Sequence, residues 1–172
     1  MPGTRIRRSR GVRSPAVIGI TSAAFQDNGD IPPRYTRAGG NVSPAVSWSA
    51  LPKKTASVAL ICEDPDAPGH DPFTHWVVYN IPANLRGLPE GILQGPQPGG
   101  LPGAEQGKND FGNVGYDGPA PPRGDGIHRY QFQIYALDEA LPLSPGVTAE
   151  VAWQAMKDHV LGKGVLMGVY SL

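Results

Sequence analysis

Cysteine is nearly missing from this 172-residue sequence, and the single Cys62 excludes an internal disulfide. Cys62 follows a run of apolar residues, where we expect a buried and inert thiol rather than a nucleophile. An excess of either charge is also missing, because 15 Lys and Arg balance 15 Asp and Glu. A neutral chain has no overall field to attract nucleic acid or an anionic membrane. Binding of nucleic acid is therefore not expected, and any site for an anion must be local.

Long apolar segments are missing too, since no stretch approaches the ~20 apolar residues of a membrane-spanning helix. Residues 1–15 carry five arginines, and the apolar stretch after them is shorter than the ~7–15 residues of a secretory signal. These features predict a disordered basic tail over residues 1–15 and a cytoplasmic protein. The remaining length, residues 16–172, suits one domain and is too short for two.

Glycine and proline are abundant, with 23 and 19 occurrences, and they alternate with short apolar runs. This alternation is typical of a mostly β fold with many turns. Apolar runs and alternating polar and apolar residues predict strands at 16–21, 41–48, 55–63, 76–81, 128–137 and 165–170. One helix is predicted over residues 148–161, because Thr148 can cap its start and Gly162 can end it. Residues 85–116 show no periodic pattern and predict a long irregular segment.

The stretch 62–69, Cys-Glu-Asp-Pro-Asp-Ala-Pro-Gly, comes at the end of a predicted strand. Asp64 and Asp66 have the spacing that places two side chains on the same face of a strand, so we expect their carboxylates side by side at its mouth. The alternative is a plain turn in which Asp64 closes an Asx-type hydrogen bond. Because an X-Pro bond is the one at which the cis form costs least, we also expect a cis bond between Ala67 and Pro68.

Three further motifs follow along the chain: His-Trp-Val-Val-Tyr-Asn-Ile-Pro at 75–82, Gly-Pro-Ala-Pro-Pro at 118–122 and His-Arg-Tyr at 128–130. Together with Asp-Pro-Asp-Ala-Pro at 64–68, this series resembles the phosphatidylethanolamine-binding protein family. It is most similar to the bacterial and archaeal branch, which is often called Raf-kinase-inhibitor-like. Four motifs in the same order, spread over residues 20–170, are a far more specific signal than a lone glycine pattern.

The resemblance implies a fold with a central β-sheet packed on a second, smaller sheet and one helix in the C-terminal region. It also implies a pocket for a ligand, without catalytic residues, a cofactor or a metal, and it makes a homodimer possible. The implied ligand-binding residues are Asp64, Asp66, His75, Pro122, His128 and Tyr130, and the implied pocket wall includes Gly118 and Pro121. Bacterial members commonly have cysteine where this chain has Arg37 and Ala120, so thiol chemistry is excluded at those positions.

The predicted site residues suit a small zwitterionic or anionic ligand. Two imidazoles and the phenol of Tyr130 can donate hydrogen bonds to an anionic head group. A carboxylate beside each imidazole would raise the protonated fraction that an anion favours, and the carboxylates themselves suit an ammonium group. Phosphoethanolamine, or a small phosphate or carboxylate, would be complementary to such a site.

Three functions are weighed on these residues. The first, which we favour, is a binding module for a head group that also restrains a protein partner such as a kinase or protease. The second is a hydrolase in which His75 or His128 is the general base, although no serine lies in a nucleophile-elbow pattern. The third is a metal site of two histidines and an aspartate, although no local metal-binding signature is present. The same polar groups could also simply satisfy one another at the ends of strands.

Overall fold

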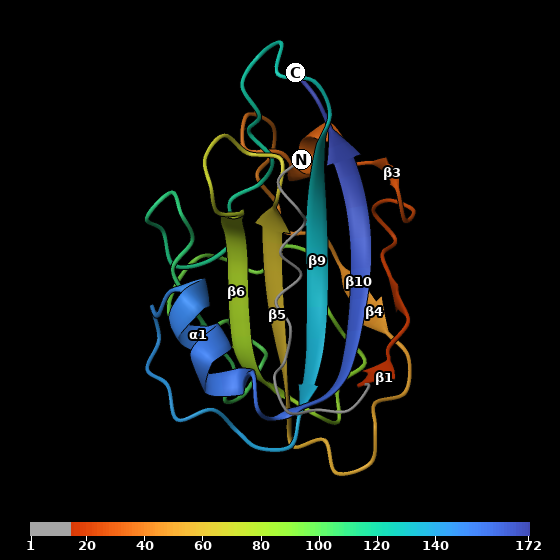
Figure 1. Ribbon diagram of the computed structural model, residues 1–172, viewed down its shortest axis with the longest axis vertical. Coiled ribbons are helices and arrows are strands. Elements are labelled where there is room, and N and C mark those ends of the chain that lie inside the picture. Colours follow the sequence, from red (N-terminus) through yellow and green to blue (C-terminus); the bar gives the residue numbers. More distant parts are fainter. Residues whose placement is uncertain (1–14) are drawn as a thin grey trace.

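The structure, a computed structural model, describes residues 15–172 and consists of two β-sheets and a helix (Figure 1). The strands of the larger sheet are β1 (Ala16–Val17), β3 (Gly29–Asp30), β5 (Ser57–Asp64), β6 (Phe73–Pro82), β8 (Glu105–Gln106), β9 (His128–Leu137) and β10 (Val160–Tyr170). The smaller sheet contains β2 (Ile20–Thr21), β4 (Val46–Trp48) and β7 (Gly87–Leu88), and the helices are η1 (Pro33–Tyr35) and α1 (Ala149–Met156). The predicted tail, residues 1–15, lies outside the described residues except for Pro15.

The long strands β6, β5, β9 and β10 lie side by side and are all antiparallel to their neighbours. The short strands β1 and β3 pair with β10 in the parallel direction, so the larger sheet is mixed. These findings confirm the predicted fold class: a mostly β protein in which a central sheet accompanies a smaller one, with one helix late in the chain. Within residues 15–172, no helix is long and apolar enough to cross a membrane.

Both faces of β5 are buried, which explains its continuous apolar sequence. On one face, Cys62 lies between Phe132 of β9 and Trp76 of β6 in a core shared with the smaller sheet. On the other face, Ile61 belongs to a second core that includes Trp153 of α1. Figure 1 shows α1 beside β6 on this face of the sheet.

The predicted strand 16–21 is divided between the two sheets. Ala16 and Val17 pair with β10, whereas β2 pairs with β4 of the smaller sheet. The chain crosses at Gly19, whose backbone N–H donates to the hydroxyl of Ser49 rather than to a strand of the larger sheet. The apolar run predicted the extended backbone correctly, but it carried no information on which sheet each half joins.

The predicted helix 148–161 is shorter in the structure. Thr148 caps α1 as expected, and its side-chain oxygen accepts a hydrogen bond from the N–H of Val151. The helix then ends at Met156, and β10 begins at Val160 instead of 165, because Val160 pairs with Leu137 of β9. Pairing across the sheet therefore overrides the helical pattern of the local sequence.

The expected cis bond between Ala67 and Pro68 is wrong, since no peptide bond of the described residues is cis. The turn after β5 instead reverses direction with the help of Gly69, which has a positive φ of 121°. The chain therefore forms this turn with a trans bond between Ala67 and Pro68.

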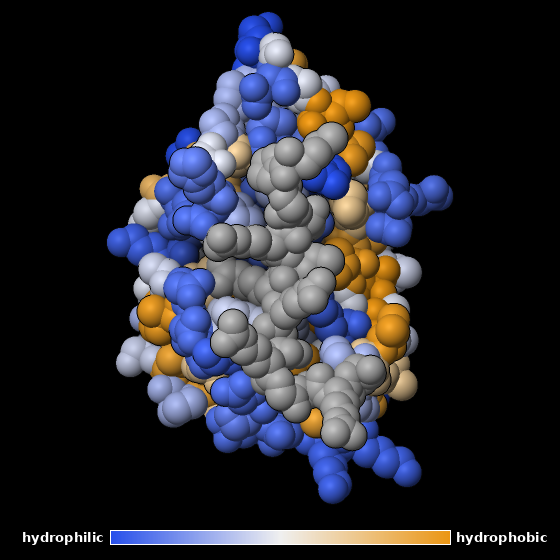
Figure 2. Space-filling view, viewed as in Figure 1, coloured by the Kyte–Doolittle hydropathy of each residue, from blue (hydrophilic) through white to orange (hydrophobic). Residues whose placement is uncertain are grey.

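The outward face of β10 carries apolar side chains. Gly164, Leu166 and Gly168 are buried, whereas the intervening Val165 is 43% exposed. Apolar side chains are visible over this strand in the space-filling view (Figure 2). This apolar face of β10 suits contact with a second copy of the chain. The possible homodimer stays a prediction, which a measurement of molar mass in solution would test.

Candidate functional site

A pocket of about 220 Å³ lies where three long strands of the larger sheet meet. Because β5 is antiparallel to both β6 and β9, the end of β5 at Asp64 lies beside the beginnings of β6 and β9. The pocket is lined by Asp64, Ala67, Pro68, Phe73, His75, Phe111, Ala120, Pro121, Pro122, His128 and Tyr130. Two of the predicted site residues, Asp66 and Gly118, are not part of this lining.

The pocket combines buried polar groups with aromatic walls. Asp64, His75, His128 and Tyr130 are all between 1 and 3% exposed. The ring of His75 lies edge-on to that of Tyr130, with 5.2 Å between ring centres. Polar groups in such an apolar setting interact more strongly with a ligand than they would in water.

The aromatic wall comes from two phenylalanines that we did not single out from the sequence. Phe73 and Phe111 are both half-buried, and their ring centres are 4.8 Å apart. Phe73 begins β6, but Phe111 comes from the irregular segment 85–116, where no periodic pattern indicates which side chains turn inward. Only the folded structure brings Phe111 to the pocket.

His128 is held between two carboxylates. Its Nδ1 is 2.6 Å from Oδ2 of Asp64, and its Nε2 is 2.6 Å from Oδ2 of Asp125. A carboxylate can only accept, so both ring nitrogens donate when the imidazole is protonated. Burial opposes this charge, but the hydrogen bonds and the attraction of Asp64 and Asp125 outweigh it, and the pKa of His128 is raised. Its two carboxylate partners therefore favour the cationic form of His128.

His75 has the opposite character. Its Nδ1 lies 2.7 Å from the backbone carbonyl oxygen of Asp117, and this oxygen only accepts, so Nδ1 carries a proton. Burial is the largest influence and lowers the pKa of His75, which favours the neutral ring with a lone pair on Nε2. The expected rise in protonation therefore holds for His128 but not for His75, which is a hydrogen-bond acceptor at neutral pH.

Asp66 turns away from the pocket and pairs with Arg129. Its carboxylate accepts hydrogen bonds from Nε and Nη2 of Arg129 at 2.9 and 2.8 Å, and these bonds lower its pKa. The backbone N–H of Asp66 donates to Oδ1 of Asp64 at 2.7 Å, which is the Asx-type bond of the turn alternative. Asp64 therefore closes the turn and holds His128 at the same time. Asp66 instead links the turn after β5 to Arg129 near the start of β9.

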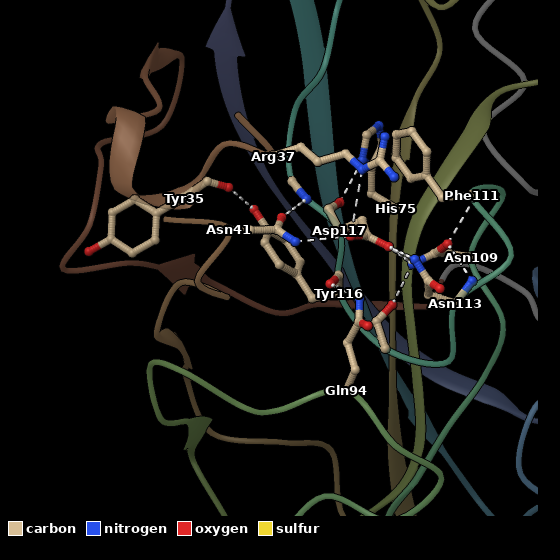
Figure 3. A network of polar contacts seen from close by, with 12 residues as sticks. Tyr35, Arg37, Asn41, His75, Gln94, Asn109, Phe111, Asn113, Tyr116 and Asp117 are labelled. Carbon is tan, nitrogen blue, oxygen red and sulfur yellow. Dashed lines mark hydrogen bonds and ion pairs between the residues drawn. The ribbon is translucent and has the colours of Figure 1, made fainter. Parts of the chain in front are cut away.

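Behind His75, the buried carboxylate of Asp117 is the centre of a polar network (Figure 3). Its Oδ1 accepts a hydrogen bond from Asn41 at 2.9 Å, and its Oδ2 accepts bonds from Asn109 and Asn113, both at 2.8 Å. Burial favours the protonated acid, but these three amides and the charge of Arg37 outweigh it, so the pKa of Asp117 is lowered. The network joins two segments without regular structure, one between η1 and β4 and the other between β8 and β9.

The same network supports the aromatic wall of the pocket. The guanidinium of Arg37 lies over the ring of Phe111, 3.9 Å from its centre, and its Nε is 3.8 Å from Oδ1 of Asp117. Figure 3 shows the Arg37 side chain reaching toward Phe111 and His75. Arg37, which stands where bacterial relatives were expected to have cysteine, thus packs behind the pocket.

Gly118, a predicted wall residue, packs tightly against a neighbouring backbone. A Cβ at this position would lie 2.1 Å from the carbonyl oxygen of Tyr35. We therefore expect Gly118→Ala to reduce the free energy of unfolding by about 1–3 kcal/mol, because the two segments must move apart. Urea unfolding would measure this loss. Gly99→Ala is the control, because a Cβ there meets nothing within 4 Å, and equal stability of the two variants would contradict the prediction.

The two alternative functions gain little from the geometry. The lining residues, all within the described range 15–172, include no serine, threonine or cysteine, and burial raises the pKa of the Cys62 thiol. In the same range, metal-binding side chains come together at Asp138, Glu139 and His159, and the first of these directly follows the other end of β9. Among the described residues, neither a hydroxyl or thiol nucleophile of these types nor this cluster therefore lines the pocket.

Comparisons with known proteins agree with this architecture. A family model described as phosphatidylethanolamine-binding protein matches residues 21–171. A UPF0098 protein of Methanothermobacter thermautotrophicus is 49% identical over 89% of this chain and 98% of its own length. The crystal structure of Escherichia coli YbcL has 32% identity and a TM-score of 0.85, covering 91% of this chain and 99% of YbcL. The crystal structure of CT736 of Chlamydia trachomatis has 38% identity and a TM-score of 0.80, and the match covers 91% of this chain and 98% of the CT736 chain.

Proposed function

Because the chain belongs to the phosphatidylethanolamine-binding protein family, we propose that its pocket binds a small phosphate monoester such as phosphoethanolamine. The observation that carries this proposal is the His128 ring with its raised pKa, which lines the pocket together with aromatic side chains. A volume of about 220 Å³ is below the ~300–1,000 Å³ typical of sites for drug-sized ligands, which favours a small head group.

The polar groups of the pocket match both ends of a zwitterion. Phosphate oxygens can accept hydrogen bonds from the Tyr130 hydroxyl and from the His128 ring. An ammonium group can donate to Nε2 of the neutral His75 ring or to the carboxylate of Asp64. The proposed ligand thus uses a donor, the Tyr130 hydroxyl, together with the His128 ring for its phosphate, and an acceptor on His75 or Asp64 for its ammonium group.

The proposal extends to a protein partner. The mouth of the pocket is exposed at Pro68, Ala120 and Pro122, so a segment of another protein that carries a phosphate or carboxylate could enter it. A kinase or a protease restrained in this way is the partner that we propose. A cytoplasmic location would be compatible with such a role and stays a prediction.

Isothermal titration with phosphoethanolamine, inorganic phosphate and acetate tests the proposed ligand directly. We expect saturable heat with the two phosphate compounds and weaker or no heat with acetate. Co-sedimentation with phosphatidylethanolamine vesicles separates the two sources of the head group, since only a lipid ligand would bring the protein down with the vesicles. Heat with none of the small compounds and no co-sedimentation would contradict the proposed function.

The Tyr130 hydroxyl gives a further prediction. Tyr130→Phe is expected to weaken binding of phosphoethanolamine about tenfold, because a hydrogen bond to a charged group contributes ~1.5–3 kcal/mol and part of this is regained through water. Titration of the variant measures the change. Tyr79→Phe is a matched control, since the Tyr79 hydroxyl donates to the Ser144 carbonyl and Tyr79 does not line the pocket. Equal loss in both variants would argue against a contact between Tyr130 and the ligand.

A further inference from the structure

Asp125 occupies the position that an anionic ligand needs on His128. Its Oδ2 lies 2.6 Å from Nε2, so it already accepts the proton that a phosphate oxygen would accept. The other ring nitrogen is taken by Asp64 at the same distance. A ligand can therefore reach a ring N–H of His128 only if one of these two carboxylates moves.

The two carboxylates differ in how firmly they are held. The side chain of Asp64 is 3% exposed and stands at the end of β5, where it also accepts the backbone N–H of Asp66. The side chain of Asp125 is 41% exposed, and among residues 15–172 the only side chain that it pairs with is His128. Water can replace His128 as the partner of Asp125 at little cost, whereas Asp64 would be left buried and uncompensated. Asp125 is thus the partner that can leave.

The backbone around Asp125 is suited to such a movement. Residues 122–127 are all exposed, and Asp125 lies between Gly124 and Gly126, which have positive φ angles of 80° and 83°. The N–H of Asp125 closes a turn with the carbonyl of Pro122 at 3.1 Å. Pro122 and His128, on either side of this turn, both line the pocket, so the turn borders the site without filling it.

We propose that Asp125 is an internal anion that competes with the ligand phosphate for His128 and so sets the affinity of the pocket for anions. This inference rests on the proposed function. In the unliganded protein, Asp125 neutralises the imidazolium and holds the turn against the site. Phosphate binds by displacing the Asp125 carboxylate into solvent, and its apparent affinity is reduced by the fraction of molecules in which the carboxylate occupies His128.

Titration of the full chain with inorganic phosphate tests the competition. Asp125→Ala is expected to lower the dissociation constant at least tenfold, because the competing carboxylate is gone. Asp125→Asn is expected to give a smaller gain, since its amide oxygen still accepts from His128 but carries no charge. Asp138→Asn is the matched control: Asp138 also pairs with a histidine, His159, at 2.8 Å, but it lies outside the pocket and should leave the affinity unchanged.

A second measurement follows Asp125 in the wild-type protein and does not depend on any variant. The ¹³C resonance of the Asp125 carboxylate is expected to shift as phosphate saturates the pocket, because the group loses its contact with His128. The resonance of Asp138 should stay in place.

The outcomes separate this inference from the proposed function. Tighter phosphate binding by Asp125→Ala, or phosphate binding by this variant alone, supports the competition. Phosphate binding by the wild-type protein with equal or weaker affinity in Asp125→Ala overturns the inference and leaves the proposed function intact. If Asp125 held the ammonium group instead, the variant would bind phosphoethanolamine more weakly and phosphate equally well, which also overturns it. Binding of phosphate by neither protein would contradict both.

Discussion

Asp117→Ala is expected to reduce the free energy of unfolding by about 2–4 kcal/mol, because a buried carboxylate that accepts several hydrogen bonds is lost. The carboxylate of Asp117 accepts three side-chain amides, from Asn41, Asn109 and Asn113, and alanine would leave all three without this acceptor. The full cost of ~1–3 kcal/mol for an unsatisfied buried donor applies to Asn109, whereas water already reaches the half-buried Asn41 and the exposed Asn113. Urea unfolding at neutral pH measures the loss.

Two further variants show whether the carboxylate itself is responsible. Asp117→Asn keeps the shape and one acceptor oxygen, so its loss should be smaller than that of the alanine variant. Asp138→Ala removes an exposed carboxylate and should change stability by less than about 0.5 kcal/mol. A loss below about 1 kcal/mol for Asp117→Ala would mean that the network is not a structural support of the pocket. The lowered pKa of Asp117 adds a pH test, because its contribution should be present above about pH 4 and disappear as the pH falls further.

The part of the site that lies on regular strands could be predicted from the sequence. The apolar run before Asp64 and the alternating pattern from His128 to Leu137 both predict strands, and the structure has them as β5 and β9. Once these strands are antiparallel neighbours, the end of one must lie beside the beginning of the other. The contact between Asp64 and His128 therefore follows from the sequence patterns of β5 and β9 and from the antiparallel pairing of these two strands.

The spacing rule failed where the strand ended. Asp64 and Asp66 have the spacing of side chains on one face, but this rule holds only while the backbone stays extended. β5 ends at Asp64, and the turn that follows directs the Asp66 carboxylate to Arg129. The sequence contained the competing signal, since proline between two aspartates is typical of a turn.

The supporting groups could not be found from sequence patterns. Asn109, Phe111 and Asp117 come from residues 85–127. In this described segment the only strands are β7 and β8, which have two residues each. Side chains of such a segment have no period that distinguishes inward from outward positions. Their roles are fixed by partners far along the chain, as with Asn41, which is 76 residues from Asp117. Asp125 was missed for a different reason, because an aspartate between two glycines is typical of an ordinary surface turn.

The second large effect concerns Asp64. Asp64→Asn is expected to lower the free energy of unfolding by about 3 kcal/mol near pH 6, because the buried His128 imidazolium loses its buried counter-charge. Asparagine still offers an oxygen to the backbone N–H of Asp66, but its other terminal group is a donor and faces the Nδ1 proton of His128. Urea unfolding of both proteins at the same pH measures the difference.

The pH dependence of stability identifies the charge pair as the cause. The pKa of His128 is raised in the folded protein, so its contribution is complete below about pH 6.5 and is lost as the pH rises through the higher folded value. His75, whose pKa is lowered, acts in a separate window below about pH 6.5, where stability falls as the pH decreases. Unfolding measured from about pH 6.5 to 9 should therefore show a decline in the wild-type protein that is smaller in Asp64→Asn, where only Asp125 remains to raise the pKa of His128. Asp66→Asn, which breaks the pair with Arg129 and leaves both carboxylates on His128, should keep that decline. If the decline were the same in all three proteins, it would arise from groups other than the Asp64–His128 pair, and the cationic state of His128 on which phosphate binding depends would lose its support.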